Sequence, residues 1–509
     1  MSEGARGHEV EATARNETPP DSDGQGLSEV VRKARAAQRD WAEQPVASRI
    51  RVVSRLKRSV LSLADELARA AQSETGVLSS EVLLTEIAPI AALTRFWLRT
   101  IDEALAPVDV DLSQFLQMGR SGRTWKAPVG VLALITSSVH PIAIPLRTII
   151  PAILVGNAVI WKPSRATSET SRALMRAMTA VLPAGLVSAA TDGQEESDTL
   201  IAAGIDGVIF SGMADAGRRV LAACAKSLTP ATLELGGKDA AVVLADARIE
   251  RAARGIVWGA FSSGGQSQSS IQRAYVERSI APAFIARLVA LTKALESGRD
   301  IGGRLDEQER ATVRRQLDEA EKRGAEFLAG GSDTVEHDAP TPTIVRVEDD
   351  DVELVRERTP GPVLAVIVVD GIDQAVDRVR SSRFALTTSV WTRSVDRSID
   401  IARRLGTPVV TFNYHSANPP PPEVPWGGRS ESGFGIVGGA PALSAFTHTR
   451  FVAEDRTPFA RDFGWFPYTT ALQSTAKLLP KVRGGASPLG RLIAFFSLVW
   501  ALLKRLFGR

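Results

Sequence analysis

The chain has 509 residues, which at roughly 150 residues per domain predicts two to four domains. Its composition, 44% hydrophobic and 23% charged, is typical of globular proteins and provides enough apolar side chains for a large core. The single cysteine, Cys224, excludes a disulfide framework and a thiolate metal cluster, and the five histidines show no metal-ligand spacing. We therefore expect no metal site, and a reducing, cytoplasmic setting.

Charge is distributed unevenly along the chain. Residues 1–26 are polar and lack a basic-then-apolar pattern, so we expect a disordered tail and no secretion signal. The net charge is +3, but residues 456–509 carry nine Lys or Arg against one acid, a net +8, and the remainder carries −5. A basic extension is attracted to anionic surfaces. Its basic residues alternate with aliphatic ones, which favours a membrane surface over nucleic acid.

The hydrophobic pattern changes its period along the chain. In residues 27–105 apolar residues recur at three- and four-residue steps, which predicts long amphipathic helices. Residues 106–127 alternate over short stretches and contain glycines, which predicts an extended ribbon. Apolar runs then alternate with helical segments, which predicts an α/β fold with largely parallel sheets. The runs expected to be strands are 129–135, 157–161, 207–210, 240–244, 364–369 and 408–412.

The C-terminal apolar segment is too short to cross a membrane as a helix. Residues 492–503 are twelve uncharged residues, bracketed by Arg491 and by Lys504 and Arg505. At 1.5 Å per residue they cover roughly 18 Å of the roughly 30 Å hydrocarbon core. Two placements remain open: the helix lies on an anionic membrane surface, which we favour, or it packs on the protein or at a subunit interface.

Five motifs follow one another in a fixed order. They are Pro128-Val-Gly130 through Gly156-Asn-Ala158 to Trp161-Lys-Pro-Ser164; Phe210-Ser-Gly212; Leu233-Glu-Leu-Gly-Gly-Lys238; Gly265-Gln266 with Arg273-Ala-Tyr-Val276; and Pro425-Trp-Gly-Gly428 with Ser432-Gly433. In this order the chain resembles the aldehyde dehydrogenase superfamily from about residue 27 to 452. The resemblance implies an α/β fold with a Rossmann-type cofactor domain, an α/β catalytic domain and a small oligomerisation ribbon.

The resemblance also implies domain boundaries. They are a cofactor-binding domain at 27–233 with the ribbon at about 108–126, a catalytic-type domain at 234–430, an oligomerisation strand region at 431–454 and a basic extension at 455–509. A homodimer or homotetramer is expected, with contacts through the ribbon and the strand near 444–451.

Aldehyde oxidation in this family needs a thiol nucleophile, an oxyanion donor, a base and a nicotinamide that accepts hydride. The resemblance implies that Glu234 stands at the position of the base. At the nucleophile position the family's Gly-Gln-x-Cys reads Gly265-Gln-Ser-Gln268, with Arg273 five residues further on. An amide is neither nucleophilic nor ionisable, so covalent aldehyde oxidation by the usual route cannot begin at Gln268.

Two further positions depart from the family pattern. The oxyanion asparagine is replaced by Val139, and losing such a donor costs about 10²–10³ in rate. The family's Glu-x-Phe-Gly-Pro, whose carboxylate binds the nicotinamide ribose, reads Arg358-Thr-Pro-Gly-Pro362. We therefore expect a catalytically degenerate member that acts as a binding or scaffold protein, a pseudoenzyme. The alternative is an active NAD(P)-dependent oxidoreductase that oxidises an aldehyde to a carboxylic acid.

Several positions match the family's nucleotide site. The resemblance implies that Lys162 and Ser164 hold the adenosine ribose. Arg165 replaces a glutamate there, and it either pairs with the 2′-phosphate of NADP or is a plain surface residue. The other expected nucleotide-binding positions are Ser211, Gly212, Gly217 and Gly236. NAD or NADP is the expected cofactor, with weakened binding.

An esterase-like activity is a further alternative. Ser267, Ser269 or Ser270 would act as a hydroxyl nucleophile near Glu234. Serine needs an adjacent base, and no histidine is near these serines in the sequence. His140, beside a proline in a loop, is interpreted as a polar filler, and Cys224 as a buried structural thiol.

Overall fold

The computed structural model describes residues 22–112, 119–190, 197–331, 341–415, 420–458, 460, 462, 464–480, 482 and 487–507. The expected N-terminal tail falls mostly on residues 1–21, which lie outside the described residues. Its last residues are helical, because helix α1 runs from Ser22 to Ala42. The expected boundary at residue 26 was therefore wrong. Leu27 and Val31 are buried one helical turn apart, and the helix that carries them begins a turn earlier.

Helices cover the N-terminal region, as the three- and four-residue spacing predicted. The elements after α1 are α2 (Val46–Ser62), α3 (Ala64–Thr75), α4 (Ser79–Val82), the π-helical turn η1 (Leu83–Ile87) and α5 (Ala88–Leu105). In α2 the buried residues Val53, Leu56 and Val60 recur at three and four positions and join the core of the first sheet.

The first sheet has six strands in the order β17-β7-β6-β3-β4-β5. They are β3 (Val131–Thr136), β4 (Ala158–Lys162), β5 (Val187–Ala189), β6 (Gly207–Gly212), β7 (Ala231–Leu235) and β17 (Gly433–Phe434). All pairs are parallel except β17 with β7. The connecting helices are α6 (Ala143–Val155), α7 (Ser168–Thr179), α8 (Ser197–Ala202) and α9 (Ala214–Ser227). Every residue of α6 is buried, which explains why its sequence is apolar apart from Arg147 and Thr148.

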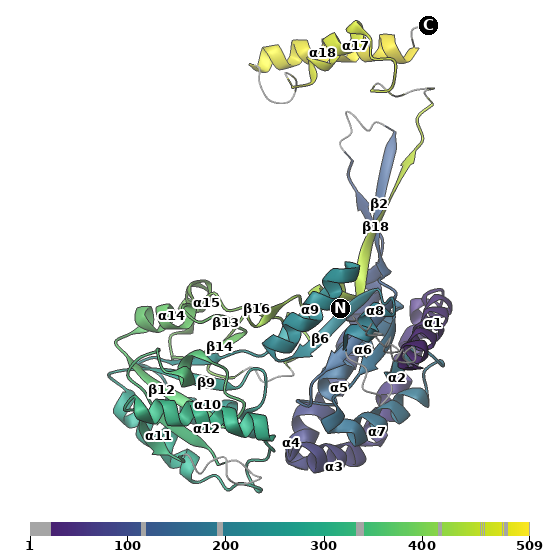
Figure 1. Ribbon diagram of the computed structural model, residues 1–509. Helices are drawn as coiled ribbons and strands as arrows, with labels where there is room; N and C mark the ends of the chain where they lie inside the picture. The colour runs from purple at the N-terminus through teal and green to yellow at the C-terminus, as the bar shows by residue number, and fades with distance from the viewer. Residues whose placement is uncertain are drawn as a thin grey trace, which may run out of the picture. The chain divides into compact units, whose positions relative to one another are not determined.

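The second sheet has seven strands in the order β10-β11-β12-β9-β8-β14-β15. They are β8 (Asp239–Val243), β9 (Ile271–Glu277), β10 (Glu326–Ala329), β11 (Thr343–Arg346), β12 (Val363–Val369), β14 (Thr387–Trp391) and β15 (Val409–Phe412). Only β10 with β11 is antiparallel. Buried runs in parallel strands require cover on both faces, and helices supply it (Figure 1).

The helices of the second sheet divide between two hydrophobic cores. One core includes residues of α12 (Glu307–Lys322), α14 (Ile372–Arg380) and α15 (Ser398–Leu405), and the other includes residues of α10 (Ile249–Phe261) and α11 (Ala281–Lys293). The two sheets belong to one compact unit, formed by the described residues among 1–106 and 126–448. Its remaining short elements are η2 (Arg165–Thr167), η3 (Ser262–Gly265), α13 (Glu353–Arg356), β13 (Phe384–Ala385), η5 (Val395–Arg397), β16 (Arg429–Ser430), η6 (Ala440–Ala442) and α16 (Leu443–Phe446).

Residues 107–125 and 449–509 form a second compact unit. Its sheet has the order β1-β2-β18, with β1 (Val108–Val110), β2 (Arg120–Pro128) and β18 (Thr447–Asp455), and its helices are α17 (Thr470–Ala476) and α18 (Pro488–Phe507). The expected oligomerisation strand region at 431–454 needs a correction. Its beginning forms β17, which is paired with β7 in the first sheet, and β18 alone contributes to the ribbon.

Helix α10 packs closely on the second sheet because Gly255 has no side chain. A Cβ at Gly255 would overlap the indole ring of Trp391, which is fully buried. We expect Gly255→Ala to lower the free energy of unfolding by about 1–3 kcal/mol, because the ring has no space to move into. Urea denaturation measures this change.

The matched control is Gly26→Ala in α1, where nothing lies within 4 Å of the added Cβ. This control should stabilise the protein slightly, by up to about 1 kcal/mol, through helix propensity. An unchanged denaturation midpoint for Gly255→Ala would show that the contact with Trp391 is not tight.

Candidate active site

The loop that carries the nucleophile position joins α10 to β9. Its backbone has positive φ at three consecutive residues, Ser263, Gly264 and Gly265. A Cβ at Gly265 would overlap the backbone of Gly361, so the glycine permits both the left-handed turn and the close approach of the two loops. Ser263 is held in this conformation by Glu81, whose Oε1 accepts bonds from its N–H (2.6 Å) and its hydroxyl (3.0 Å).

Gln268 is buried, with 3% of its surface exposed. Its side-chain amide donates to the Ser211 hydroxyl at 2.8 Å and to the backbone oxygen of Glu234 at 3.3 Å. The residue at the nucleophile position therefore links the carboxyl ends of β6 and β7. It also contacts Ser211, one of the residues expected at the nucleotide site.

Glu234 is held by two buried donors. It is 2% exposed, and its Oε1 accepts a hydrogen bond from Trp426 Nε1 at 2.9 Å and forms an ion pair with Arg147 of α6, which is 4% exposed. A buried carboxylate in this pairing compensates the buried charge of the arginine. The sequence reasoning missed this partner. The signal was present, because Arg147 is the only charged residue between 141 and 155.

Arg358, which stands where the family has a carboxylate, binds the backbone of the nucleophile loop. Its Nη2 donates to the carbonyls of Gln266 (2.8 Å) and Ser267 (2.9 Å), and its Nη1 donates to those of Gly237 (3.0 Å) and Gln268 (3.3 Å). Burial lowers the pKa of the guanidinium. Four charge-assisted bonds from one group hold two loops together.

The guanidinium of Arg358 also covers Gly236. A Cβ at Gly236 would lie 2.9 Å from Arg358 Cζ, so the glycine is what allows this approach. Gly236 is one of the positions expected to bind the nucleotide. In this structure a cationic side chain takes the space beside it.

Val139 lies in the loop after β3, is half-buried and has no hydrogen-bond donor in its side chain. The next residue, His140, is buried with a φ of 50°. Its Nε2 lies 3.4 Å from the Ser267 hydroxyl oxygen, and its Nδ1 lies 3.8 Å from Glu86 Oε1. The interpretation of His140 as a filler missed both contacts. Sequence alone has little signal for them, because His140 and Ser267 are 127 residues apart.

The other two serines of the loop have no comparable partner. The hydroxyls of Ser269 and Ser270 are buried, and among the described residues neither has a hydrogen-bond partner. Of the three serines considered as nucleophiles, Ser267 is therefore the one that the fold brings to a histidine.

The expected nucleotide-binding residues gather at one edge of the first sheet. Lys162 ends β4, and Ser211 and Gly212 end β6. Both strands pair in parallel with β3, so these residues lie at the carboxyl edge, where doubly wound sheets bind their ligands.

Ser164 and Gly217, two other residues expected at the nucleotide site, have structural roles in their own elements. The Ser164 hydroxyl accepts a bond from the N–H of Ala166 (3.3 Å) and so caps the short helix η2 that begins at Arg165. Gly217 is buried in α9, and a Cβ there would lie 2.7 Å from Leu235 Cδ2, so the glycine lets the helix approach β7 closely.

Two buried ionisable residues follow the Gly-Gly turn. Lys238 Nζ donates to the Thr359 hydroxyl at 2.9 Å, and burial lowers the pKa of Lys238 well below its usual value. Asp239 accepts bonds from the N–H and the hydroxyl of Thr387, and burial raises its pKa to about 7. Both residues brace the loops around the site.

Cys224 and metal ligands play no visible part in the site. Cys224 is buried in α9, and burial raises the pKa of its thiol, so the prediction of a structural thiol is confirmed. Among the residues that the structure describes, no group of three or more His, Cys, Asp or Glu is arranged to hold a metal ion.

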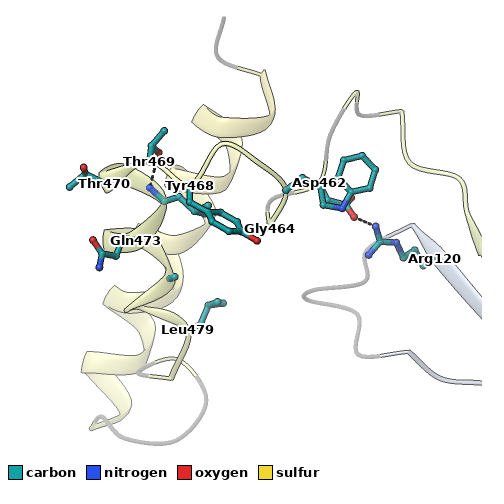
Figure 2. Close-up of a pocket in the computed structure, with 11 residues that line it drawn as sticks. Arg120, Asp462, Gly464, Tyr468, Thr469, Thr470, Gln473 and Leu479 are labelled. Carbon is teal, nitrogen blue, oxygen red and sulfur yellow. Dashed lines mark hydrogen bonds and ion pairs between the residues drawn. The ribbon is translucent and has the colours of Figure 1, made fainter.

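The second unit contains a separate pocket, lined by residues of β2, of α17 and of the segments before and after α17 (Figure 2). Arg120 and Asp462 form an ion pair at the edge of the pocket. The side chain of Tyr468 lies between this ion pair and α17 (Figure 2). The exposed rings of Trp465 and Tyr468 contribute its apolar surface. The pocket contains none of the residues expected to be catalytic.

The pairing of Glu234 with Arg147 generates a stability prediction. We expect Glu234→Gln to lower the free energy of unfolding by about 3–5 kcal/mol, because it leaves the Arg147 charge buried without compensation. Equilibrium unfolding followed by circular dichroism measures the loss. The double variant Glu234→Gln with Arg147→Met should lose less than the single one. A single variant as stable as the wild type would contradict the structural pairing.

The chain is similar to known proteins over most of its length. The model of the aldehyde dehydrogenase family matches residues 13–452. The 4,4'-diapolycopene aldehyde oxidase of Methylomonas sp is 30% identical over 452 residues, 87% of this chain and 84% of the relative. The benzaldehyde dehydrogenase (NAD(+)) of Pseudomonas putida is 28% identical over 453 residues, 86% of this chain and 90% of the relative.

A solved structure agrees with these relatives. The NADP-dependent glyceraldehyde-3-phosphate dehydrogenase from Bacillus halodurans C-125, complexed with NADP, has a TM-score of 0.77 and 26% identity, and the match covers 85% of this chain and 92% of the other. The two-sheet α/β architecture, the ordered motifs and these matches lead to one conclusion: the chain belongs to the aldehyde dehydrogenase family.

Proposed function

We propose that this chain is an NAD(P)-dependent oxidoreductase that acts on an aldehyde. Family membership supports this class, since the relatives are named for aldehyde oxidation with NAD or NADP. The observation that carries the proposal is the hydrogen bond of Gln268 to Ser211, 2.8 Å long. It joins the nucleophile position to the edge of the sheet expected to hold the nucleotide. An oxidoreductase needs this convergence, because hydride passes directly between substrate and cofactor.

The residues present fit one half of the cofactor better than the other. Lys162 and Ser211 lie at the carboxyl edge, where an adenosine and pyrophosphate would bind. Where the nicotinamide half would bind, Arg358 covers Gly236 and donates its hydrogen bonds to backbone carbonyls. When bound, NAD or NADP would supply the hydride acceptor. Weak binding of the nicotinamide half is therefore part of the proposal.

A second candidate is a catalytically degenerate member that acts as a binding or scaffold protein. A specific observation favours it: Gln268 supplies no thiol, and Glu234 is occupied by Arg147 and Trp426. The comparisons favour the oxidoreductase, because the relatives are named as enzymes. Under either candidate, oxidation does not start from a thiol at position 268.

One experiment separates the two candidates. NAD(P)H formation is measured with purified protein and a panel of short- and long-chain aldehydes, for the wild type, Gln268→Cys, and Gln268→Cys with Val139→Asn. Turnover by the wild type supports the oxidoreductase. In the double variant the restored donor should raise turnover about 10²–10³-fold over the single variant.

Two other outcomes would contradict the oxidoreductase. No turnover by the wild type, together with turnover by the double variant, would identify a preserved pocket whose chemistry has been removed. No turnover by any variant, together with no nucleotide binding by calorimetry, would contradict both the oxidoreductase and its nucleotide site.

The C-terminal helix supports a further proposal, attachment to an anionic membrane surface. No helix in the described part of the chain has the length and apolarity to cross a membrane. Helix α18 instead exposes large apolar side chains, among them Leu492, Ile493, Phe496 and Trp500. Residues 456–509 carry a net charge of +8, which is attracted to acidic headgroups. The alternative occupant of this face is another copy in a homodimer or homotetramer.

Vesicle sedimentation tests the membrane proposal. The full chain should sediment with vesicles containing phosphatidylserine and remain in the supernatant with phosphatidylcholine vesicles. The variant Ile493→Ser with Trp500→Ser should lose most of the binding, because it removes two exposed apolar contacts. If this variant sediments with the vesicles as much as the wild type does, or if it changes oligomeric state instead, the result would favour a subunit interface.

A further inference from the structure

We propose that Ser267, His140 and Glu86 form a hydrolytic triad that transfers short acyl groups from esters or thioesters to water. The activity requires no nucleotide. It therefore goes beyond the oxidoreductase function and does not depend on it.

The three side chains are arranged as nucleophile, base and orienting carboxylate. The imidazole of His140 lies between the other two and uses a different nitrogen for each: Nε2 is 3.4 Å from Ser267 Oγ, and Nδ1 is 3.8 Å from Glu86 Oε1. This order is what defines a serine triad, whatever the fold or chain order. Both distances are longer than a good hydrogen bond, as is common in catalytic sites without substrate, where contacts tighten on binding.

Glu86 is held through Oε2, the carboxylate oxygen that does not face His140. Its Oε2 accepts the backbone N–H of Ile142 at 2.9 Å and of Ala143 at 3.1 Å, at the beginning of α6. These bonds leave Oε1 directed at His140. Glu86 lies in the π-helical turn η1, a local feature that is frequent at functional sites.

His140 is held in a conformation that costs energy. Its φ of 50° lies in the left-handed region, which is uncommon for residues other than glycine, although histidine adopts it more often than most residues do. Such strained residues cluster at active sites.

Ser267 is positioned through its backbone. Its carbonyl accepts from Arg358 Nη2 at 2.9 Å, and the same guanidinium holds the residues on either side, Gln266 and Gln268. Arg358 is thus a positioning residue. Glu234 is bound to Arg147, so the base that faces Ser267 is His140 and not the carboxylate considered from the sequence.

The reaction balances without an oxidant. Ser267 Oγ attacks the acyl carbon and its proton passes to His140 Nε2; the bond from carbon to the leaving oxygen or sulfur breaks, and the leaving group takes that proton. Water then attacks the acyl-serine, gives a proton to Nε2, and the proton returns to Oγ as the carboxylic acid leaves. Ser267 and His140 are each 6% exposed, so an acyl group must be small to reach the Ser267 hydroxyl.

The test measures hydrolysis of 4-nitrophenyl acetate by the full chain without added nucleotide. We expect Ser267→Ala and His140→Gln each to lower kcat/KM at least about 100-fold, and Glu86→Gln to lower kcat with little change in KM. The matched control is Ser270→Ala, which removes a buried hydroxyl with no partner among the described residues and should retain hydrolysis.

A fluorophosphonate probe gives a readout that does not depend on the folding of any variant. Mass spectrometry of the labelled wild type should find the modification on the peptide that contains Ser267. Absence of both hydrolysis and label, label on another residue, or full hydrolysis by a folded Ser267→Ala variant would overturn the proposal. The oxidoreductase function is unaffected by any of these outcomes, because the assay contains no nucleotide.

Discussion

The site depends on one cation, the guanidinium of Arg358. It binds carbonyl oxygens from two loops, Gly237 after β7 and residues 266–268 before β9, and so joins the ends of the two sheets. The nucleophile loop has no regular hydrogen-bond ladder of its own, and buried carbonyls without partners are costly. A residue that differs from the family pattern therefore organises the loop on which the reactive positions lie.

The ionisable groups around this loop have partners that the family resemblance did not single out. Glu234 forms an ion pair with Arg147 and accepts a hydrogen bond from Trp426, which makes it a member of a buried polar network. His140 and Glu86, which the resemblance did not single out, are the titratable pair that faces a hydroxyl in the loop.

Family membership and chemistry are separate conclusions for this chain. The two parallel sheets, the glycine turns and the carboxyl edge carry the fold, and they match relatives over most of the chain. Chemistry depends on a few side chains at that edge, and a fold supports different reactions when those side chains change. Here Gln268 lies at the expected nucleophile position, and its side-chain amide donates hydrogen bonds to the Ser211 hydroxyl and to the backbone oxygen of Glu234.

The sequence by itself determined the family, the N-terminal helices and six of the strands, β3, β4, β6, β8, β12 and β15. The spacing in residues 27–105 predicted helices, the apolar runs predicted parallel strands, and the ordered motifs located Gln268. These features are local, so a pattern of a few residues encodes them. Only the tertiary structure decided that Glu234 meets Arg147, 87 residues earlier, and that Ser267 meets His140, 127 residues earlier. Such contacts arise when the two sheets and α6 pack together, and no local period in the sequence records which distant side chains then touch.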